Sequence, residues 1–309
     1  MVTGGAGYVG CVLVPKLLSA GYSVLVYDLM LFGSDALPSH PRLTSIQGDL
    51  RDTNMFSKSV EGSDAVIHLG AISNDPSFEL DSELSRSINY DCFGPIVRES
   101  KNAGVKRFIY ASTSSVYGVS NAPEVTEDHP LVPLTDYNKY KGMCEPILLD
   151  YKSPEFTTVI VRPATVCGYS PRMRFDLSVN ILTNHAVNRR KITVFGGSQQ
   201  RPNIHIDDIA DLYVKMLGYP EDLVNGEIFN ASLENHSMTE LAEIVRNVVE
   251  EEYPGDPIEI EFTQTNDLRS YHVSTRKIFD NLGYEPKLTI GDAVRGICGA
   301  FKSGLLPGS

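Results

Sequence analysis

The sequence lacks a basic tract, and it lacks a run of apolar residues long enough to cross a membrane. Its longest apolar runs, such as residues 24–27, fall far short of the roughly 20 residues that a membrane span needs. Asp and Glu number 39 against 27 Lys and Arg, and the net charge of −12 argues against a nucleic-acid-binding surface. No signal-peptide pattern is present. We therefore expect neither a membrane partner nor a nucleic-acid partner.

Cysteine is scarce, with five in 309 residues, and no two of them have a CxxC spacing. An odd number without that spacing argues against a disulfide framework and against a zinc site. We therefore expect no bound metal, and a reducing, cytoplasmic location. Apolar residues make up 42% and charged residues 21%, which is an ordinary composition for a soluble globular protein.

Short apolar runs alternate with helix-length segments along the first half of the chain. The runs cover 23–27, 44–47, 65–69, 108–111 and 157–161, and the helical segments cover 11–19, 54–60, 82–101 and 137–151. Such alternation predicts an α/β fold, a Rossmann-type doubly wound parallel sheet with helical crossovers. Residues 1–3 lead straight into glycines, so either residues upstream are missing or the first strand is very short.

The pattern changes after Arg162. A long segment with several charges runs to Arg201, and then we expect a helix over 206–217, a strand over 227–230 and an amphipathic helix over 238–252. The tail, 258–309, has short strands and helices with Pro and Gly breaks. We predict a first domain of residues 1–167 plus about 204–231, and a smaller discontinuous lobe of about 168–203 plus 232–309.

Glycines stand at positions 4, 7 and 10, a spacing one residue different from the usual dinucleotide-binding fingerprint. Glycines there permit a tight strand-to-helix turn, the approach of backbone to a pyrophosphate and the packing of helix on strand. The N-terminus of the next helix then offers N–H groups and a positive dipole to phosphates. A plain turn would use the same glycines, but here a helix and then a strand that ends in Asp28 follow.

Asp28 stands where a carboxylate can accept hydrogen bonds from an adenosine ribose. It would repel a 2′-phosphate, and no Arg or Lys follows it closely, which favours NAD over NADP; a turn or helix-cap role is the alternative. Two further strand ends can contribute. Asp49 either bonds the adenine amino group or caps the helix at 54–60. The loop 68–71 either runs beneath the dinucleotide or serves packing alone.

Tyr137 and Lys141 are four residues apart and share one face of a predicted helix. To be half ionised near pH 7, a phenol must have its ordinary pKa of about 10 lowered by about 3 units, or about 4 kcal/mol. One cation at about 4 Å supplies about 4 kcal/mol at an effective dielectric constant of about 20. A lysine ammonium and a positive nicotinamide ring therefore suffice to make Tyr137 a base. Alone, such a pair is also typical of a solvated helix face.

The run 108–118 is predicted to be a buried strand that ends in hydroxyl residues. Ligands of doubly wound sheets bind at the carboxyl ends of strands, and a hydroxyl there can bridge a substrate oxygen and the tyrosine phenol. A simple Ser/Thr turn is the alternative for this segment taken singly. The glycine turn, the strand-end acid, the hydroxyls and the Tyr–Lys pair in this order favour an NAD-dependent enzyme.

The chain resembles the extended short-chain dehydrogenase/reductase superfamily, in its nucleotide-sugar epimerase/dehydratase branch, over essentially its whole length. The resemblance lies in TGGAGYVG at 3–10, GDL at 48–50, STSSVYG at 112–118, YNKYK at 137–141 and RPNIHIDD at 201–208. Residues 169–180 and 267–278 look like the subgroup that contains bacterial GDP-heptose 4-dehydrogenases.

The resemblance implies a role for each matching residue. It implies that NAD is bound by Gly4, Gly7, Gly10, Asp28, Asp49, Leu50, Leu69, Gly70, Ala71, Tyr137 and Lys141, with the ribose on Asp28 and the adenine on Asp49. It implies that Tyr137 is acid and base, that Lys141 bonds the nicotinamide ribose and tunes Tyr137, and that Thr113 is the catalytic hydroxyl. The implied substrate is a nucleotide-diphosphate sugar, held by Arg201 at its pyrophosphate and by Asn180 and Arg269 on the nucleotide side. Arg172 and Arg174 either face phosphate or are surface charges.

The implied activity is NAD-dependent oxidation of a nucleotide-linked sugar at C4, within an epimerase cycle. A net 4-dehydrogenase that releases a keto sugar would use the same residues and stays an alternative, as does a catalytically silent NAD-binding scaffold. The 4,6-dehydratases of the branch carry two acids where this chain has Ser114 and Ser115, so a dehydratase is disfavoured. The resemblance also implies a homodimer through the helices at 82–101 and 137–151, whose apolar residues would equally serve core packing.

Overall fold

The chain forms two compact units, each assembled from separate stretches of sequence. The computed structural model describes residues 1–73, 75–265 and 270–307. The first unit comprises Met1–Val116, Pro130–Arg162 and Ala210–Phe229. The second comprises Tyr117–His129, Pro163–Ile209 and Asn230–Ser309, so the loop that follows the hydroxyl segment groups with the second unit.

A parallel sheet forms the centre of the first unit. Its strands are β1 (Val2–Thr3), β2 (Val24–Asp28), β3 (Leu43–Gln47), β4 (Ala65–His68), β5 (Arg107–Ala111), β6 (Thr157–Pro163) and β10 (Glu227–Ala231). They lie in the order β3-β2-β1-β4-β5-β6-β10, and the pairs from β3 to β6 are all parallel. The order runs one way from β1 to β3 and the other way from β4 to β6, which is the doubly wound arrangement. The predicted fold class is confirmed.

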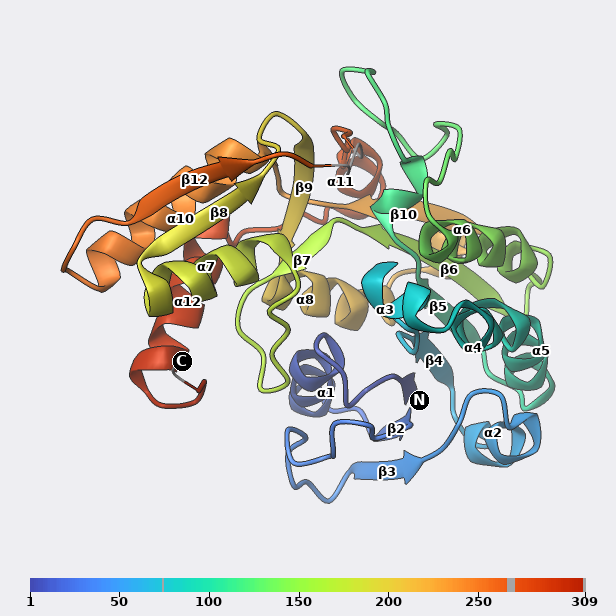
Figure 1. Cartoon of the computed structure of the whole chain (residues 1–309). Coiled ribbons are helices and arrows are strands. Elements are labelled where there is room, and N and C mark those ends of the chain that lie inside the picture. The colour runs from blue at the N-terminus through green and yellow to red at the C-terminus, as the bar shows by residue number, and fades with distance from the viewer. Residues whose placement is uncertain (74, 266–269, 308–309) are drawn as a thin grey trace. The chain divides into compact units, whose positions relative to one another are not determined.

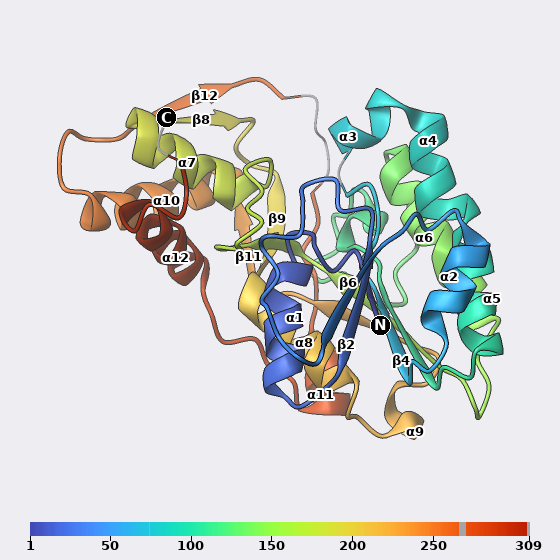
Figure 2. The same cartoon turned by 90° about the horizontal axis from the view of Figure 1, so that it is seen from below.

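Helices cover both faces of this sheet. Figure 2 shows α1 (Gly10–Ser19) and α8 (Ile206–Met216) on one face, and α2 (Thr53–Val60), α5 (Phe93–Asn102) and α6 (Asp136–Leu149) on the other. Under α5, the rings of Phe93 and Tyr110 are fully buried with their centroids 4.7 Å apart. The strands are rich in fully buried apolar residues, as a parallel sheet covered on both faces requires. Two shorter helices, α3 (Asp75–Leu80) and α9 (Glu221–Val224), complete the unit.

The prediction of one helix over 82–101 is wrong. The structure has α4 (Ser82–Arg86), a π-helical turn (Ser87–Asp91) and α5 in its place. The buried amide of Asn89 exchanges two hydrogen bonds of 2.8 Å with the backbone of Ile72, and these bonds hold the π-helical turn against the segment after β4. Pro95 lacks an N–H, and it lies in the first turn of α5, where a helix does not need that N–H.

The second unit contains two small sheets. One has β7 (Thr165–Cys167), β9 (Gln200–His205) and β11 (Glu234–Ser237), and the other pairs β8 (Lys191–Phe195) with β12 (Glu259–Thr263) in parallel. Figure 1 shows β8 and β12 side by side. Helices α7 (Ser178–Arg189), α10 (Met238–Glu252) and α12 (Ile290–Lys302) share one core, to which each contributes a buried aliphatic residue such as Leu182, Val245 and Val294. A short helix, α11 (Arg276–Leu282), precedes α12.

Sequence patterns predict some elements of this region and miss others. The helix expected over 238–252 is α10, which begins with a capping box between Ser237 and Glu240. The helix at 206–217 and the strand at 227–230 correspond to α8 and β10. Helix α7 follows Leu177 without a side-chain cap, so its start carries no sequence signal. Within the described part of the chain, no helix is long and apolar enough to cross a membrane.

Candidate active site

The turn between β1 and α1 carries the three glycines. Gly4 has a φ of +69°, and a Cβ on it would lie 2.7 Å from the Cα of Gly70. A Cβ on Gly10 would lie 2.4 Å from the carbonyl oxygen of Gly5. The first position therefore requires a left-handed backbone, and the third requires close packing of helix on turn. The N-terminus of α1 follows directly, with N–H groups that can bind a pyrophosphate.

Asp28, the last residue of β2, binds this turn directly. Its Oδ2 accepts a hydrogen bond from the N–H of Ala6 at 3.0 Å, and its Oδ1 accepts one from the N–H of Met30 at 2.8 Å. The carboxylate is half-buried, and each oxygen has a second lone pair for a donor such as a ribose hydroxyl. Asp28 therefore stands at the strand end and also fixes the position of the glycine turn, a second task that the sequence did not reveal.

Asp49 follows β3 and is paired with a cation that sequence reasoning missed. Arg51 donates to the Asp49 carboxylate from Nε at 3.0 Å and from Nη2 at 2.5 Å, and these hydrogen bonds lower the pKa of Asp49. The cap of α2 is Asp52, whose Oδ1 accepts from the N–H of Met55 at 2.9 Å. The alternative that Asp49 caps this helix is therefore wrong. An arginine two residues from an aspartate carries no distinctive sequence signal.

The loop after β4 packs against the glycine turn. The N–H of Leu69 donates to the Thr3 carbonyl at 3.0 Å, and the N–H of Gly70 donates to the Thr3 hydroxyl at 3.3 Å. The same hydroxyl lies 2.8 Å from Nδ1 of His68. Burial lowers the pKa of His68 to about 3, so its ring is neutral. The structure thus brings the predicted residues Leu69 and Gly70 to the turn, beside a buried Thr–His pair that sequence reasoning did not single out.

Helix α6 carries the Tyr–Lys pair. Its N-cap is Thr135, whose Oγ1 accepts from the N–H of Asn138 at 3.4 Å, so Tyr137 lies in the first turn. Lys141 is buried, and its Nζ donates to the carbonyl of Ala111 at 2.5 Å and lies 4.5 Å from the ring centroid of Tyr110. Burial lowers the pKa of Lys141 to about 8, which leaves an ammonium at neutral pH one helical turn from Tyr137.

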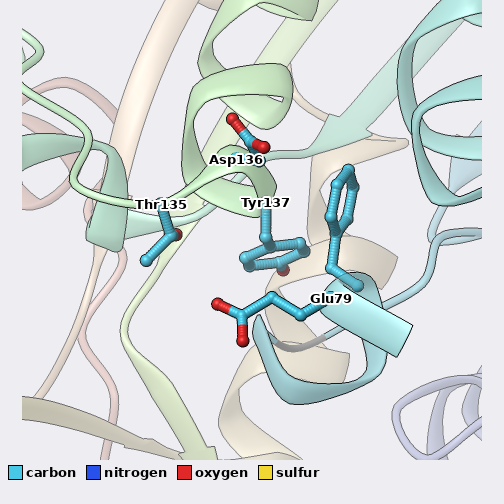
Figure 3. Close-up of a pocket in the computed structure, with 5 residues that line it drawn as sticks. Glu79, Thr135, Asp136 and Tyr137 are labelled. Atoms are coloured by element: carbon cyan, nitrogen blue, oxygen red, sulfur yellow. The ribbon is translucent and has the colours of Figure 1, made fainter. Parts of the chain in front are cut away.

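Tyr137 lines a small pocket, together with Phe78, Glu79, Thr135 and Asp136. Figure 3 shows the Glu79 side chain passing next to the Tyr137 ring, with its carboxylate on the Thr135 side. Asp136 lies on the first turn of α6, on the other side of the ring. Glu79 belongs to α3, in a segment where the sequence predicts no element, and nothing in the sequence alone marks it as a site residue.

A row of hydroxyl groups follows β5, in a short 3₁₀ turn (Ser114–Tyr117). Oγ1 of Thr113 lies 2.7 Å from Oγ of Ser115, and the N–H of Ser115 donates to the same Thr113 oxygen at 3.2 Å. Ser115 donates onward to Oδ1 of Asn138, which is fully buried. The structure therefore brings Thr113 to the N-terminal turn of α6 by way of Ser115 and Asn138, two residues that sequence reasoning did not assign.

A buried ion pair fixes α6 on the sheet. Glu145 and Arg162 are joined by hydrogen bonds from Nε at 3.0 Å and from Nη2 at 2.6 Å, and both side chains are almost inaccessible to solvent. Ser112, the neighbour of Thr113, donates to the same carboxylate at 2.6 Å. Glu145 lies one turn beyond Lys141, so the helix that carries the Tyr–Lys pair is tied to β6 and to the segment after β5.

The residues predicted to bind the substrate nucleotide lie in the second unit. Asn180 is fully buried and uses its amide locally, accepting from the N–H of Gly168 at 3.0 Å and donating to the carbonyl of Arg174 at 2.9 Å. Arg174 is ion-paired with Asp176 at 2.5 Å. Arg201 is half-buried on β9. Arg269 lies outside the described residues.

Comparison with known proteins identifies the family. Residues 1–232 match the NAD dependent epimerase/dehydratase family. The chain belongs to this family. Its predicted membership of the extended short-chain dehydrogenase/reductases is thereby confirmed, and so is NAD as its cofactor. The narrower resemblance to GDP-heptose 4-dehydrogenases stays a prediction. Among the described residues, no group of three or more His, Cys, Asp or Glu side chains could hold a metal ion.

Several relatives are epimerases by name. The chain is 28% identical over 324 residues to the "Putative UDP-arabinose 4-epimerase 2" of Arabidopsis thaliana, covering 94% of this chain and 76% of that protein. It is 27% identical to the "UDP-glucose 4-epimerase" of Lactobacillus helveticus, covering 93% and 92%. The solved structure of the UDP-glucuronic acid 4-epimerase of Bacillus cereus, in complex with UDP-glucuronic acid and NAD, is similar with a TM-score of 0.86 and 26% identity, covering 98% of both chains.

Proposed function

We propose that this protein oxidises a nucleotide-linked sugar at C4 and returns the hydride to the other face of the ring, as a nucleotide-sugar 4-epimerase. The observation that carries the proposal is the first turn of α6, where Tyr137 lines a pocket one turn from the buried ammonium of Lys141 and next to the Thr113–Ser115–Asn138 row. The relatives named as 4-epimerases support the same reaction.

The residues of the first unit fit NAD. The glycine turn leaves no room for side chains at Gly4 and Gly10, and the N-terminus of α1 follows it. We assign the pyrophosphate to Gly4, Gly7 and Gly10, the adenosine ribose to Asp28, the adenine side to Asp49 and Leu50, and the floor of the site to Leu69, Gly70 and Ala71. Arg51 would share Asp49 with the adenine. When bound, NAD supplies the acceptor and later the donor of a hydride.

The proton is handled by three side chains. Tyr137, as phenolate, takes the proton of the C4 hydroxyl and later returns it to the reduced carbonyl oxygen. Lys141 favours the phenolate because its ammonium persists at neutral pH, and it bonds the nicotinamide ribose. Thr113 binds the reacting oxygen. Ser115 donates its proton to Asn138, so Thr113 donates to Ser115 in the structure. Because the single proton of the C4 hydroxyl goes to Tyr137, Thr113 must turn its own proton from Ser115 to the reacting oxygen when the sugar binds.

The substrate pyrophosphate needs cations, and the second unit carries candidates. We propose that Arg201 binds the pyrophosphate, because a guanidinium can donate to two phosphate oxygens at once. Asn180 and Arg269 are proposed for the nucleotide side; Asn180 would act there through the backbone that its amide fixes. In this proposal, NAD is bound by the first predicted domain and the nucleotide part of the substrate by the second. We also propose a homodimer through the helices near 82–101 and 137–151.

Two other activities remain as alternatives to test. A net 4-dehydrogenase would use the same residues and release a keto sugar. In a catalytically silent NAD-binding scaffold, Thr113, Tyr137 and Lys141 would have no catalytic role. A dehydratase is disfavoured, because Ser114 and Ser115 offer no carboxylate for the expulsion of a C6 hydroxyl.

The test is incubation of the NAD-loaded protein with UDP-, GDP-, CDP- and dTDP-linked sugars, read by mass spectrometry and NMR. An isomer of unchanged mass with inverted C4 supports the epimerase. A keto product or its hydrate supports the dehydrogenase. Loss of water from any substrate well above the blank rate would contradict the assignment, and unchanged substrate throughout would support the scaffold.

A further inference from the structure

The pocket beside Tyr137 is acidic. Two of its five lining residues, Glu79 and Asp136, carry carboxylates, and the other three, Phe78, Thr135 and Tyr137, carry no formal charge in their ordinary state. Figure 3 shows the Glu79 side chain passing next to the Tyr137 ring, with its carboxylate on the Thr135 side. Asp136 is the first residue of α6, where the positive end of the helix dipole offsets part of its charge. Glu79 lies on a separate short helix, and its carboxylate therefore contributes most of the negative charge of the pocket.

The position of Glu79 is set by its buried neighbour. Phe78 is almost inaccessible to solvent and stacks on Tyr140 with ring centroids 5.7 Å apart and planes 21° apart. Tyr140 lies on α6, one turn from Tyr137, and its ring also contacts Tyr90 at 5.4 Å. The stacked rings therefore fix α3 against α6, and Glu79 is presented at a defined place relative to the phenol.

Among the residues that the structure describes, the cations of this region do not line the pocket. The guanidinium of Arg86 lies 5.9 Å and the ammonium of Lys139 lies 5.6 Å from the centroid of Tyr140. Arg86 is also ion-paired with Asp91 at 3.2 Å. Lys141 is buried within the first unit and donates to the carbonyl of Ala111. An anion that enters the pocket beside Glu79 thus meets a carboxylate rather than an ammonium or guanidinium among the lining residues.

We propose that Glu79 is a specificity-determining residue, which selects nucleotide sugars that carry a hydroxymethyl group at C6 and rejects the corresponding uronic acids. This inference rests on the proposed function, since it takes the C4 hydroxyl to lie against Tyr137. C6 is bonded to C5, and C5 is bonded to C4. The C6 group is therefore two bonds from the reacting carbon. A hydroxymethyl group there can donate a hydrogen bond to Glu79, whereas a uronate carboxylate would be repelled by it.

Coulomb's law sets the size of the effect. Two unit negative charges about 6 Å apart disfavour binding by about threefold when fully screened by water, and by about 100-fold at an effective dielectric constant of about 20. The pocket is open to solvent on the Glu79 side, because Glu79 is exposed, so we expect a value between these limits. Glu79→Gln keeps an oxygen that accepts from a hydroxymethyl group but removes the repulsion.

The experiment compares matched hexose and uronate substrates of the NAD-loaded protein. The pairs are UDP-glucose with UDP-glucuronic acid and GDP-mannose with GDP-mannuronic acid, and kcat/KM and the dissociation constant are measured for each. We expect the wild type to favour the hexose by about 10-fold, within the limits set by Coulomb's law. Glu79→Gln should narrow this preference at least about threefold, mainly through a lower KM for the uronate, and Glu79→Lys should reverse it. Glu83→Gln, which removes the same charge from the exposed first turn of α4, should leave the ratio unchanged.

The outcomes separate this inference from the proposed function. Equal or better turnover of the uronate by the wild type overturns the selectivity while leaving the epimerase proposal intact. A hexose preference that Glu79→Gln and Glu79→Lys do not change, or that Glu83→Gln changes equally, overturns the role of Glu79. Absence of binding and turnover with all four sugars would overturn the proposed function, and this inference with it.

Discussion

Ser115 donates its hydroxyl hydrogen bond to Oδ1 of Asn138, the residue that follows Tyr137 in the chain. A hydroxyl has one proton, so the Thr113 hydroxyl must be the donor in its 2.7 Å contact with Ser115. Asn138 therefore influences the reaction through the direction of two hydrogen bonds, although it touches neither substrate nor cofactor in the proposed mechanism.

Removing the hydroxyl of Ser115, the middle residue of the Thr113–Ser115–Asn138 row, should lower turnover mildly. In Ser115→Ala, Thr113 loses its hydrogen-bond partner, so its hydroxyl is no longer held in position for the reacting oxygen. We expect kcat to fall about 5- to 10-fold, the equivalent of roughly one hydrogen bond, with little change in the dissociation constant of NAD. Steady-state kinetics and NAD titration measure both. A loss as large as that of the tyrosine variant would mean that Ser115 itself contacts the substrate.

Tyr137→Phe should lower turnover by at least about 100-fold, the low end of what general acid–base catalysis contributes. NAD binding should barely change, because the phenol acts on the sugar. Tyr140→Phe is the matched control, since it sits one turn away and keeps the ring that stacks on Phe78. If Tyr140→Phe lost activity while Tyr137→Phe retained it, the assignment of the base would be wrong.

Lys141→Met should abolish most activity and weaken NAD binding, and it should also change how stability depends on pH. In the folded protein the pKa of Lys141 is about 8 and in the unfolded chain it is near 10.5. Between these values the unfolded chain binds more protons, so this lysine makes wild-type stability rise with pH across that window. Relative to Lys141→Met, the wild type should gain about 3 kcal/mol between pH 7 and pH 10.5, at about 1.36 kcal/mol per pKa unit. Urea unfolding of both proteins at several pH values tests this, and a constant difference would contradict it.

His68 should make the first unit sensitive to acid. The pKa of His68 is about 3 in the folded protein and near 6.5 in the unfolded chain. Between these two pH values, the histidine is protonated in the unfolded chain but stays neutral in the folded protein. Its contribution to stability is complete above pH 6.5 and is lost as the pH falls toward 3, by about 1.4 kcal/mol per pH unit. His68→Asn should flatten the pH dependence of urea unfolding over this range. His272→Asn, at an exposed position, is the matched control variant.

Asp28 should set the preference between the two nicotinamide cofactors. A carboxylate at the end of β2 repels a 2′-phosphate, so the wild type should bind NAD more tightly than NADP. Asp28→Asn retains an oxygen that can accept from the N–H of Ala6 and removes the charge, so the preference should shrink without collapse of the glycine turn. Calorimetric titration gives the four dissociation constants. Equal affinities of the wild type for both cofactors would refute the assignment.

The repetitive part of the fold could be predicted from the sequence because its signals are local. Apolar runs bounded by glycine, such as those that became β2 and β4, predict buried parallel strands to within a residue or two. The glycines at 4 and 10 and the spacing of Tyr137 and Lys141 are likewise fixed by short-range geometry. These features account for the fold class and for the positions of the glycine turn and the Tyr–Lys pair.

The missed features depend on partners far away in sequence. The π-helical turn is held by Asn89 bonding Ile72, the neutral state of His68 by burial against Thr3, and the pocket acid Glu79 by the stacking of Phe78 on Tyr140. Each pair is separated by 17 to 65 positions, or joins elements whose packing no periodicity specifies. A sequence pattern identifies such residues only as polar or aromatic, and the tertiary contact decides what they do.

The buried pair of Glu145 and Arg162 makes the placement of α6 an all-or-none property. A partial slide or tilt of the helix would leave a charge inside the protein without its counterpart, at a cost of several kcal/mol. Small displacements of Tyr137 relative to the sheet are therefore resisted far more steeply than apolar packing alone would resist them. In the proposed mechanism, this resistance keeps the phenol of Tyr137 at a steadier distance from the cofactor than apolar packing alone would allow.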